Sequence, residues 1–489
     1  MGLEKIINLL INEKDENKAE GFIKFLSEKL WGYYMEYLMN KETIGKEEVS
    51  RWRFDLPNAK ENVPYDSKWI EIPAIHDSNL KGVEVLVLQV NGLSEDVHGL
   101  VVEVAEDGKR FRISGTPTLD SFRKGGATAE STFELTIIYK FIGIDLPQTD
   151  RPKLELKFPF VINQDPRKLW KNLEVDWENM PEPKYMNEDT QIDYIKVEAL
   201  QDGTPQKDIV AASKRGRSHA QEAKPRDDYF KMYHDDTTNW YGMAVADGAG
   251  SAKFSRQGSK IACETVIEHC KNELSNCEKF EEDINLWHLD QRSEEAGKMI
   301  SADIYRIIGN AAYKAHKAIV EEAKATGNPT KAYATTLLLA VCKKFEFGWF
   351  VASFWVGDGA MCLYDKENHT STLLGIPDEG EYAGQTRFLT MPEIFTDTNE
   401  FYKRLKCKIV PDFTALFLMS DGVSDPKFET DANLNNPNKW DELWEDLQNN
   451  PEHPVNLSDD NEESKNELLD WLDFWSSGNH DDRTIAILY

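Results

Sequence analysis

The chain has 489 residues, of which 40% are hydrophobic, and its 57 basic and 86 acidic side chains give a net charge of −29. This length allows about two to four domains with real cores. The charge repels nucleic acid and anionic membrane surfaces, so neither is expected as a partner. No apolar run approaches the about 20 residues that a membrane-spanning helix needs.

The N-terminus and the cysteines together predict a cytoplasmic protein. No basic stretch leads into the apolar run that marks a secretory signal. Ile6 also stands where an N-myristoylation motif has Ser or Thr. The six cysteines form no CxxC pair, which favours reduced, buried thiols. Cys263, Cys270 and Cys277 recur every seven residues, so we expect them on one helical face packed on a sheet.

Residues 1–60 are predicted to form a helical segment. Apolar residues repeat at helical spacing from Leu3 to Ile11, and again through Phe22, Leu26, Leu30, Tyr34 and Leu38. The second series is rich in aromatic residues. We therefore expect it to pack against a partner helix or against the next domain.

Residues 65–165 change to the period of β-strands and predict a β-sandwich of about 100 residues. The stretch Arg112–Thr118 reads RISGTPT and is followed by TFELTI at 132–137. Together they resemble a pattern of immunoglobulin-like domains. That resemblance implies a domain that binds or spaces partners and does not catalyse.

Residues 166–204 are charged and rich in Pro and Asn, which predicts a linker. From residue 205 onward, hydrophobic strands and long helices alternate, and this pattern predicts an α+β layered domain over 205–489. One helix is expected within 291–325. The acidic stretch 440–475 keeps Trp and Leu at near-helical spacing, so we expect a surface helical insertion with a disordered middle around 458–464.

This second half contains four dipeptides that begin with aspartate: Asp247-Gly248, Asp358-Gly359, Asp421-Gly422 and Asp481-Asp482. The first three each follow a hydrophobic strand. A single Asp-Gly is more often a plain turn. Carboxylates that converge at one edge of a sheet, however, repel each other unless cations lie among them. Carboxylate oxygens are preferred by hard cations such as Mg²⁺ and Mn²⁺.

These dipeptides lie within four of five motifs whose order along the chain is informative. The five motifs are VADGAGSA (245–252), ATTLLLAV (334–341), VGDGAMCLYD (356–365), LFLMSDGVSD (416–425) and GNHDDRTIAIL (478–488). In this order they resemble the metal-dependent protein phosphatases of the 2C type, and the pattern is most like a bacterial branch of that family. The resemblance implies a four-layer α-β-β-α domain, in which two packed antiparallel sheets are flanked by helices.

The resemblance also implies a binuclear site for Mg²⁺ or Mn²⁺. Asp247 would bridge the two ions and act with Asp421 and Asp481 through a metal-activated water. The carbonyl of Gly248 would bind the second ion. A weaker third ion would lie at Asp358. The implied ligand set is Asp228, Asp247, Gly248, Asp358, Asp421 and Asp481.

Two departures from the family pattern concern the phosphate. Many relatives carry a histidine where this chain has Ala249, and that histidine is proposed to protonate the leaving alcohol. His219 is a candidate replacement, with a structural role as the alternative. The family's phosphate-binding arginine has no exact counterpart. Arg215 and Arg217 are the candidates, and a solvated basic loop is the alternative.

The resulting hypothesis is a serine/threonine protein phosphatase whose partners are phosphorylated proteins and a serine/threonine kinase. One alternative is a catalytically inactive scaffold or phosphoprotein-binding module. Another makes the β domain the main element, in adhesion or carbohydrate binding, but the cysteines and the missing signal disfavour an extracellular role. The segment GEYAGQTRFLT (380–390) is expected to border the active site.

Overall fold

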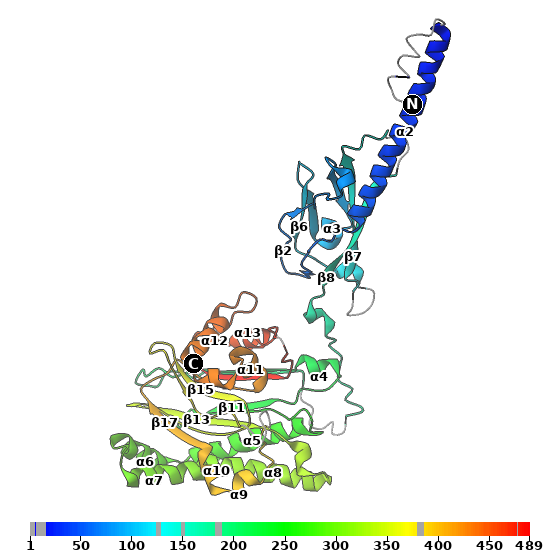
Figure 1. Cartoon of the computed structure of the whole chain (residues 1–489). Coiled ribbons are helices and arrows are strands. Elements are labelled where there is room, and N and C mark those ends of the chain that lie inside the picture. Colours follow the sequence, from blue (N-terminus) through cyan, green and yellow to red (C-terminus); the bar gives the residue numbers. More distant parts are fainter. Residues whose placement is uncertain are drawn as a thin grey trace. The chain divides into compact units, whose positions relative to one another are not determined.

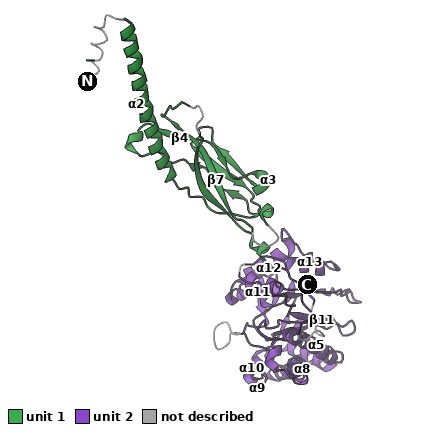
Figure 2. Ribbon diagram, turned by 90° about the vertical axis from the view of Figure 1, so that its right-hand side faces the viewer, with its two compact units in different colours: residues 1–170 green, residues 171–489 purple. Residues whose placement is uncertain are grey.

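The computed structural model describes residues 5, 16–123, 129–147, 152–180, 188–378, 386–476 and 478–489. The chain divides into two compact units, which we call unit 1 (residues 1–170) and unit 2 (residues 171–489) (Figure 2). The predicted helical series from Leu3 to Ile11, apart from Lys5, lies outside the described residues. So does most of the 380–390 segment.

The first long helix in the described part of unit 1 is α2 (Glu16–Ser50) (Figure 1). Its C-terminal part packs on the β domain, because Leu38 and Val49 are buried in the core of unit 1. Farther toward the N-terminus, Phe22, Leu30 and Tyr34 of the predicted series are exposed. The expected packing is thus seen only near Leu38. None of the helices in the described ranges combines the length and the apolarity needed to cross a bilayer.

The rest of unit 1 is a β domain with two sheets around one core. One sheet has the order β1 (Ala59–Lys60), β8 (Leu154–Asn163), β7 (Thr132–Ile142) and β4 (Glu84–Asn91). In the other, β6 (Arg110–Gly115) pairs with β2 (Tyr65–Asp66), β3 (Ile70–Glu71) and β5 (Leu100–Val104). Phe111, Leu135 and Phe160 fill the core between them. A β domain after a helix was predicted, and its immunoglobulin-like character stays a prediction.

Two antiparallel sheets form the centre of unit 2. The first has the order β16 (Thr370–Leu373), β15 (Ala360–Asp365), β18 (Ala415–Met419), β19 (Arg483–Leu488), β10 (Ile209–Lys214) and β9 (Thr190–Ile195). The second runs β11 (Tyr229–His234), β12 (Tyr241–Ala246), β13 (Leu337–Phe345), β14 (Gly348–Val356) and β17 (Leu405–Val410). Strand β9 pairs with β10 although its sequence lies inside the predicted linker 166–204.

Helices cover the outer face of each sheet (Figure 1). The second sheet is covered by α5 (Ser255–Leu274), α6 (Glu278–Leu289), α7 (Glu294–Ile304) and α8 (Asn310–Thr326), with a π-helical turn at Tyr305–Gly309. The first sheet is covered by α11 (Asp421–Phe428), α12 (Pro437–Asn449) and α13 (Ser464–Trp471). The predicted α-β-β-α layering is confirmed. The shorter helices include α4 (Arg217–Gln221), α9 (Glu393–Thr396) and α10 (Thr398–Lys403).

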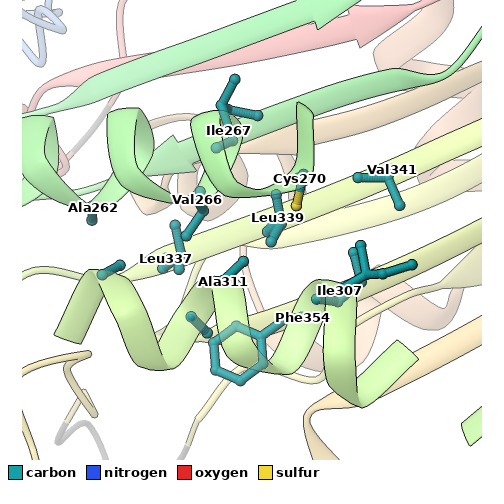
Figure 3. Packing of buried hydrophobic residues seen from close by; sticks show 14 of the residues in the cluster. Ala262, Val266, Ile267, Cys270, Ile307, Ala311, Leu337, Leu339, Val341 and Phe354 are labelled. Carbon is teal, nitrogen blue, oxygen red and sulfur yellow. The ribbon is translucent and has the colours of Figure 1, made fainter. Parts of the chain in front are cut away.

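Apolar side chains fill all three interfaces between these layers. Met243 and Leu418 meet between the two sheets. Figure 3 shows the layer beneath the second sheet, where Val266 of α5 and Ala311 of α8 pack against Leu339 of β13. The predicted cysteine face is buried there too, with one correction: Cys263 and Cys270 lie on α5, whereas Cys277 follows the end of that helix.

The acidic stretch 440–475 was wrongly predicted to be a surface insertion. Its apolar residues form the outermost core layer of unit 2, since Trp440, Leu447, Leu468 and Trp471 are all buried against the first sheet. Ser464, within the segment expected to be disordered, is fully buried at the start of α13. The acidic residues lie on the other faces of helices whose apolar sides are covered.

Replacing a side chain in this core tests the layering. We expect Leu339→Ala to destabilise unit 2 by about 2–5 kcal/mol, because Leu339 is fully buried and truncation leaves a cavity. Leu289→Ala is the matched control, since Leu289 is 80% exposed. Urea unfolding followed by tryptophan fluorescence measures both variants. Equal midpoints for the two would contradict the packing described here.

Candidate active site

Four strands deliver aspartates to one edge of the paired sheets. Asp247 directly follows β12, and Asp421 comes two residues after β18, at the start of α11. Asp358 comes two residues after β14, and Asp481 comes two residues before β19. Neighbouring strands run antiparallel, so the end of one lies beside the start of the next. Aspartates that are at least 60 residues apart in sequence thereby come together.

Three of these carboxylates are close enough to share one cation. Asp247, Asp358 and Asp421 each offer an oxygen atom, and these atoms lie within 4.8 Å of one another. Burial raises the pKa of Asp247 well above its ordinary range, and the nearby charges of Asp421, Asp228 and Asp481 raise it further. Burial and the carboxylate of Asp358 do the same for Asp421. Without a cation, this cluster can stay charged only at a large energetic cost.

Asp228 is the most deeply buried acid of the site. One of its oxygens, Oδ2, accepts hydrogen bonds from Ser420 Oγ at 2.9 Å and from Thr484 Oγ1 at 2.6 Å. Its Oδ1 and Asp421 Oδ1 are buried and have no hydrogen-bond partner among the described residues. Buried carboxylate oxygens left in this state need either a proton or a positive ligand. The donor set therefore fits hard divalent cations.

Two threonines fix the backbone around Asp247. Thr336 Oγ1 accepts a hydrogen bond from the Asp247 amide at 2.8 Å, and the Thr336 amide donates to the Asp247 carbonyl at 2.8 Å. Thr335 Oγ1 also donates to that carbonyl at 2.8 Å. Gly248 forms a β-bridge with Thr335. The two threonines therefore have a structural role, because they hold the backbone of Asp247 and Gly248 in place.

Asp482 ties the remaining pieces of the site together. Its carboxylate accepts hydrogen bonds from the amides of Gly216, at 2.6 Å, and Asp227, at 2.5 Å. Its backbone packs tightly against Gly422, where a Cβ atom would lie 1.8 Å from the Asp482 carbonyl oxygen. The turn after Asp421 therefore requires glycine for this close approach. Asp482 thus positions both Asp481 and Asp421.

His219 lies buried beside this carboxylate. Its Nδ1 is 3.1 Å from Asp482 Oδ1 and its Nε2 is 3.8 Å from Asp227 Oδ2. Burial disfavours the charged ring, but the carboxylates of Asp482 and Asp227 outweigh this effect and raise the pKa of His219 to about 10. The imidazole is therefore protonated at neutral pH. It shares a cluster with Asp481 and Asp482 whose ligand atoms lie within 4.8 Å of one another.

Arg215 and Arg217 line a cavity of about 20 Å³ together with His480 and Asp481. Both guanidinium groups already contact protein acceptors. Arg215 donates to Asn172 Oδ1 at 2.6 Å and to the Leu173 carbonyl at 3.0 Å, and it pairs with Asp189. Arg217 donates to the Asp473 carbonyl at 2.8 Å. The structure brings both arginines near Asp481, and their role in phosphate binding stays a prediction.

The sequence did not single out two further residues at this site. Arg226 is fully buried and donates to the Asp228 carbonyl at 2.8 Å and to Ser213 Oγ at 2.5 Å. Asp227 is also buried, and burial raises its pKa to about 7, against the opposing charge of His219. Their position directly before Asp228 was the only available signal. Arg226 offers a buried positive charge that holds the start of β11.

Comparison with known families shows which family unit 2 resembles. A family profile described as Protein phosphatase 2C matches residues 215–473, just over half of the chain. The chain belongs to the protein phosphatase 2C family. No curated protein sequence matches the chain significantly.

Solved structures of this family resemble the chain only distantly. Serine/threonine phosphatase Stp1 from Staphylococcus aureus is 14% identical, with 60% of this chain and 98% of that chain covered and a TM-score of 0.34. The catalytic domain of PstP, in complex with two manganese ions, is 16% identical over 61% and 98%, with a TM-score of 0.32. RsbX in complex with magnesium is 14% identical over 61% and 100%, with a TM-score of 0.32.

The buried carboxylates predict how stability depends on pH without metal. Burial, reinforced by Asp482, raises the pKa of Asp228 from 3.8 to about 7. The folded state therefore keeps this proton between about pH 4 and 7, whereas the unfolded state loses it. The contribution of Asp228 to stability is fully present below this window and is lost as the pH rises through it. Asp227 adds a fall in the same direction.

Thermal unfolding in EDTA between pH 5 and 8 measures this effect. We expect the midpoint of unit 2 to fall as the pH rises, and Asp228→Asn to make that fall smaller. Asp236→Asn is the control, because the Asp236 side chain is 99% exposed. Parallel curves for all three proteins would show that Asp228 does not titrate as described.

Proposed function

We propose that this protein is a metal-dependent serine/threonine protein phosphatase that hydrolyses phosphomonoesters. The observation that carries the proposal is the set of aspartates from distant strands whose oxygens lie within 4.8 Å of one another, with buried oxygens left without donors. A cluster of this kind is stable when divalent cations lie among its members. Membership of the protein phosphatase 2C family supports the same chemistry.

The proposed ligands of Mg²⁺ or Mn²⁺ are Asp228, Asp247, Gly248, Asp358, Asp421 and Asp481. Two ions are proposed, with a weaker third at Asp358. When bound, such cations polarise phosphoryl oxygens and lower the pKa of water. The chain's own part is to fix the ligands: Thr335 and Thr336 hold Asp247, and Ser420 and Thr484 hold Asp228. Asp247, Asp421 and Asp481 are the proposed catalytic aspartates.

Positive charge near Asp481 supports phosphate binding at this edge. Arg217 is the better of the two arginine candidates, since its side chain is 19% exposed and that of Arg215 only 4%. His219 keeps a proton on its ring at neutral pH and lies against Gly250, in the loop where Ala249 replaces the family's histidine. We therefore also propose His219 as the source of the proton or of the positive charge that the missing histidine would supply.

The proposed substrates are phosphorylated proteins, with a serine/threonine kinase as the partner enzyme and the cytoplasm as the location. The β domain of unit 1 would recruit such a protein, since it lies outside the residues matched by the family profile. The alternative is an inactive scaffold or phosphoprotein-binding module. Every proposed side-chain ligand is an aspartate, and this weighs against the alternative.

Substituting the central aspartates tests the activity. We expect Asp247→Asn and Asp421→Asn each to lower kcat on p-nitrophenyl phosphate with Mn²⁺ by at least about a thousandfold, because each removes a charged metal ligand. Without metal, the variants should melt at or above the temperature of the parent, since a buried repulsion is lost. Asp236→Asn again serves as the control. Full activity in both variants would contradict the proposed site, and a folded parent that is inactive at every Mn²⁺ concentration would favour the scaffold.

Removing residues 1–165 tests the role of the β domain. We expect the shortened protein to hydrolyse p-nitrophenyl phosphate at the rate of the full chain, because the proposed ligands all lie in unit 2. Its kcat/KM on the natural phosphoprotein should fall, since recruitment is lost. Comparing both substrates on both proteins separates the two effects. An unchanged kcat/KM on the phosphoprotein would exclude recruitment.

A further inference from the structure

A buried ion pair lies beside the proposed metal site, outside all five sequence motifs. Arg404 follows α10 and is only 3% exposed. Its Nη1 and Nη2 donate to Asp378 Oδ2 at 2.6 Å and Oδ1 at 2.7 Å. This two-bond fork fixes both the distance and the orientation of the partner carboxylate. Asp378 precedes residues 379–385, which lie outside the described ranges.

The pair holds the end of strand β14. Asp378 Oδ2 accepts a hydrogen bond from the Gly357 amide at 2.8 Å, and the Asp378 amide donates to the Gly357 carbonyl at 3.0 Å. Arg404 Nη1 also donates to the Trp355 carbonyl at 3.2 Å. The amide and the carbonyl of Gly357 are therefore both hydrogen-bonded to Asp378. The next residue in the chain is the proposed ligand Asp358.

Gly357 also touches the support of Asp247. Its φ of +114° favours glycine, and a Cβ atom there would lie 2.5 Å from Thr336 Cβ and Cγ2. Thr336 in turn exchanges hydrogen bonds with both backbone groups of Asp247. A shift of Gly357 would thus move Asp358 directly and Asp247 through Thr336. The two aspartates offer oxygens within 4.8 Å of each other, so small shifts change the ligand geometry.

A further hydrogen bond reaches Asp358 from a residue that follows 379–385 in the sequence. Thr386 Oγ1 donates to Asp358 Oδ2. This bond orients the Asp358 side chain, whereas the ion pair holds the backbone of the preceding residue, Gly357. Asp358 is thereby supported by residues outside the five motifs, at its side chain by Thr386 and through Gly357 by the ion pair.

We propose that Arg404 and Asp378 are positioning residues that set the divalent-cation affinity of the site through Gly357. This inference rests on the proposed function. Metal ligands usually depend on such supporting contacts, and loss of a support weakens affinity by about 10–100-fold. A purely structural pair would instead lower stability and leave the affinity of the folded protein unchanged.

The test is calorimetric titration of the full chain with Mn²⁺. Arg404→Lys keeps the charge but loses the fork, and Asp378→Asn keeps an acceptor for Gly357 but loses the charge. We expect the apparent Kd for Mn²⁺ to rise about tenfold in each. The Kd of the double variant should be no higher than that of the single variant with the higher Kd, because the two residues act as one unit. At saturating Mn²⁺, KM for p-nitrophenyl phosphate should stay within about twofold of the parent value.

Arg123→Lys is the matched control. Arg123 pairs with the fully buried Glu61 at 2.5 Å in unit 1, so this variant weakens a buried ion pair of similar kind away from the proposed ligands. We expect it to lower the melting temperature without changing the Kd for Mn²⁺.

Three results would overturn the proposal in distinguishable ways. If the folded variants bind Mn²⁺ within about twofold of the parent, the positioning role fails while the proposed function stands. If neither variant folds, the pair is an element of stability and the proposal also fails. If the parent neither binds Mn²⁺ nor hydrolyses phosphate esters, the proposed function fails first and this inference falls with it.

Discussion

Repulsion among buried carboxylates is the constraint on which the rest of unit 2 depends. Burial raises the pKa of Asp247 well above its ordinary range, and the charges of Asp421, Asp228 and Asp481 raise it further. Such a cluster is unfavourable for folding unless a cation is present. The surrounding layers therefore have to supply enough buried apolar surface to hold it, and the three cores between sheets and helices do so.

The supports around this cluster follow one principle. Each ligand-bearing turn is tied to a neighbouring turn by a short polar contact: Thr336 to Asp247, Ser420 to Asp228 and Asp482 to Gly216. Antiparallel pairing brings these turns to one edge. The hydrogen bonds then fix the backbone at Asp247 and the carboxylates of Asp228 and Asp482 before any ligand arrives, and such preorganisation is the usual requirement for a precise site.

The sequence predicted the layered fold and the convergence of the aspartates because both have local signatures. A hydrophobic run followed by Asp-Gly marks a strand end. The helical spacing from Ile300 to Ile319 marks a helical segment whose apolar side is buried, although a π-helical turn divides it into α7 and α8. The sequence did not predict features that depend on contacts between residues far apart in the chain. Asp378 and Arg404 carry no local pattern. β9 looks like a linker because its neighbours are polar, and the stretch 440–475 looks exposed because acidic residues outnumber its buried tryptophans.

Arg215 forms hydrogen bonds with Asn172 and Leu173 and an ion pair with Asp189, and these contacts have a practical consequence. The residues that lead into the phosphatase fold are fastened to the strand end that precedes α4 and His219, and β9 forms an edge strand of the first sheet. A recombinant fragment cut at residue 205, where the alternating strand and helix pattern begins, would discard that edge strand and leave the Arg215 guanidinium without these acceptors. An independently folding catalytic fragment has to begin upstream of Asn172.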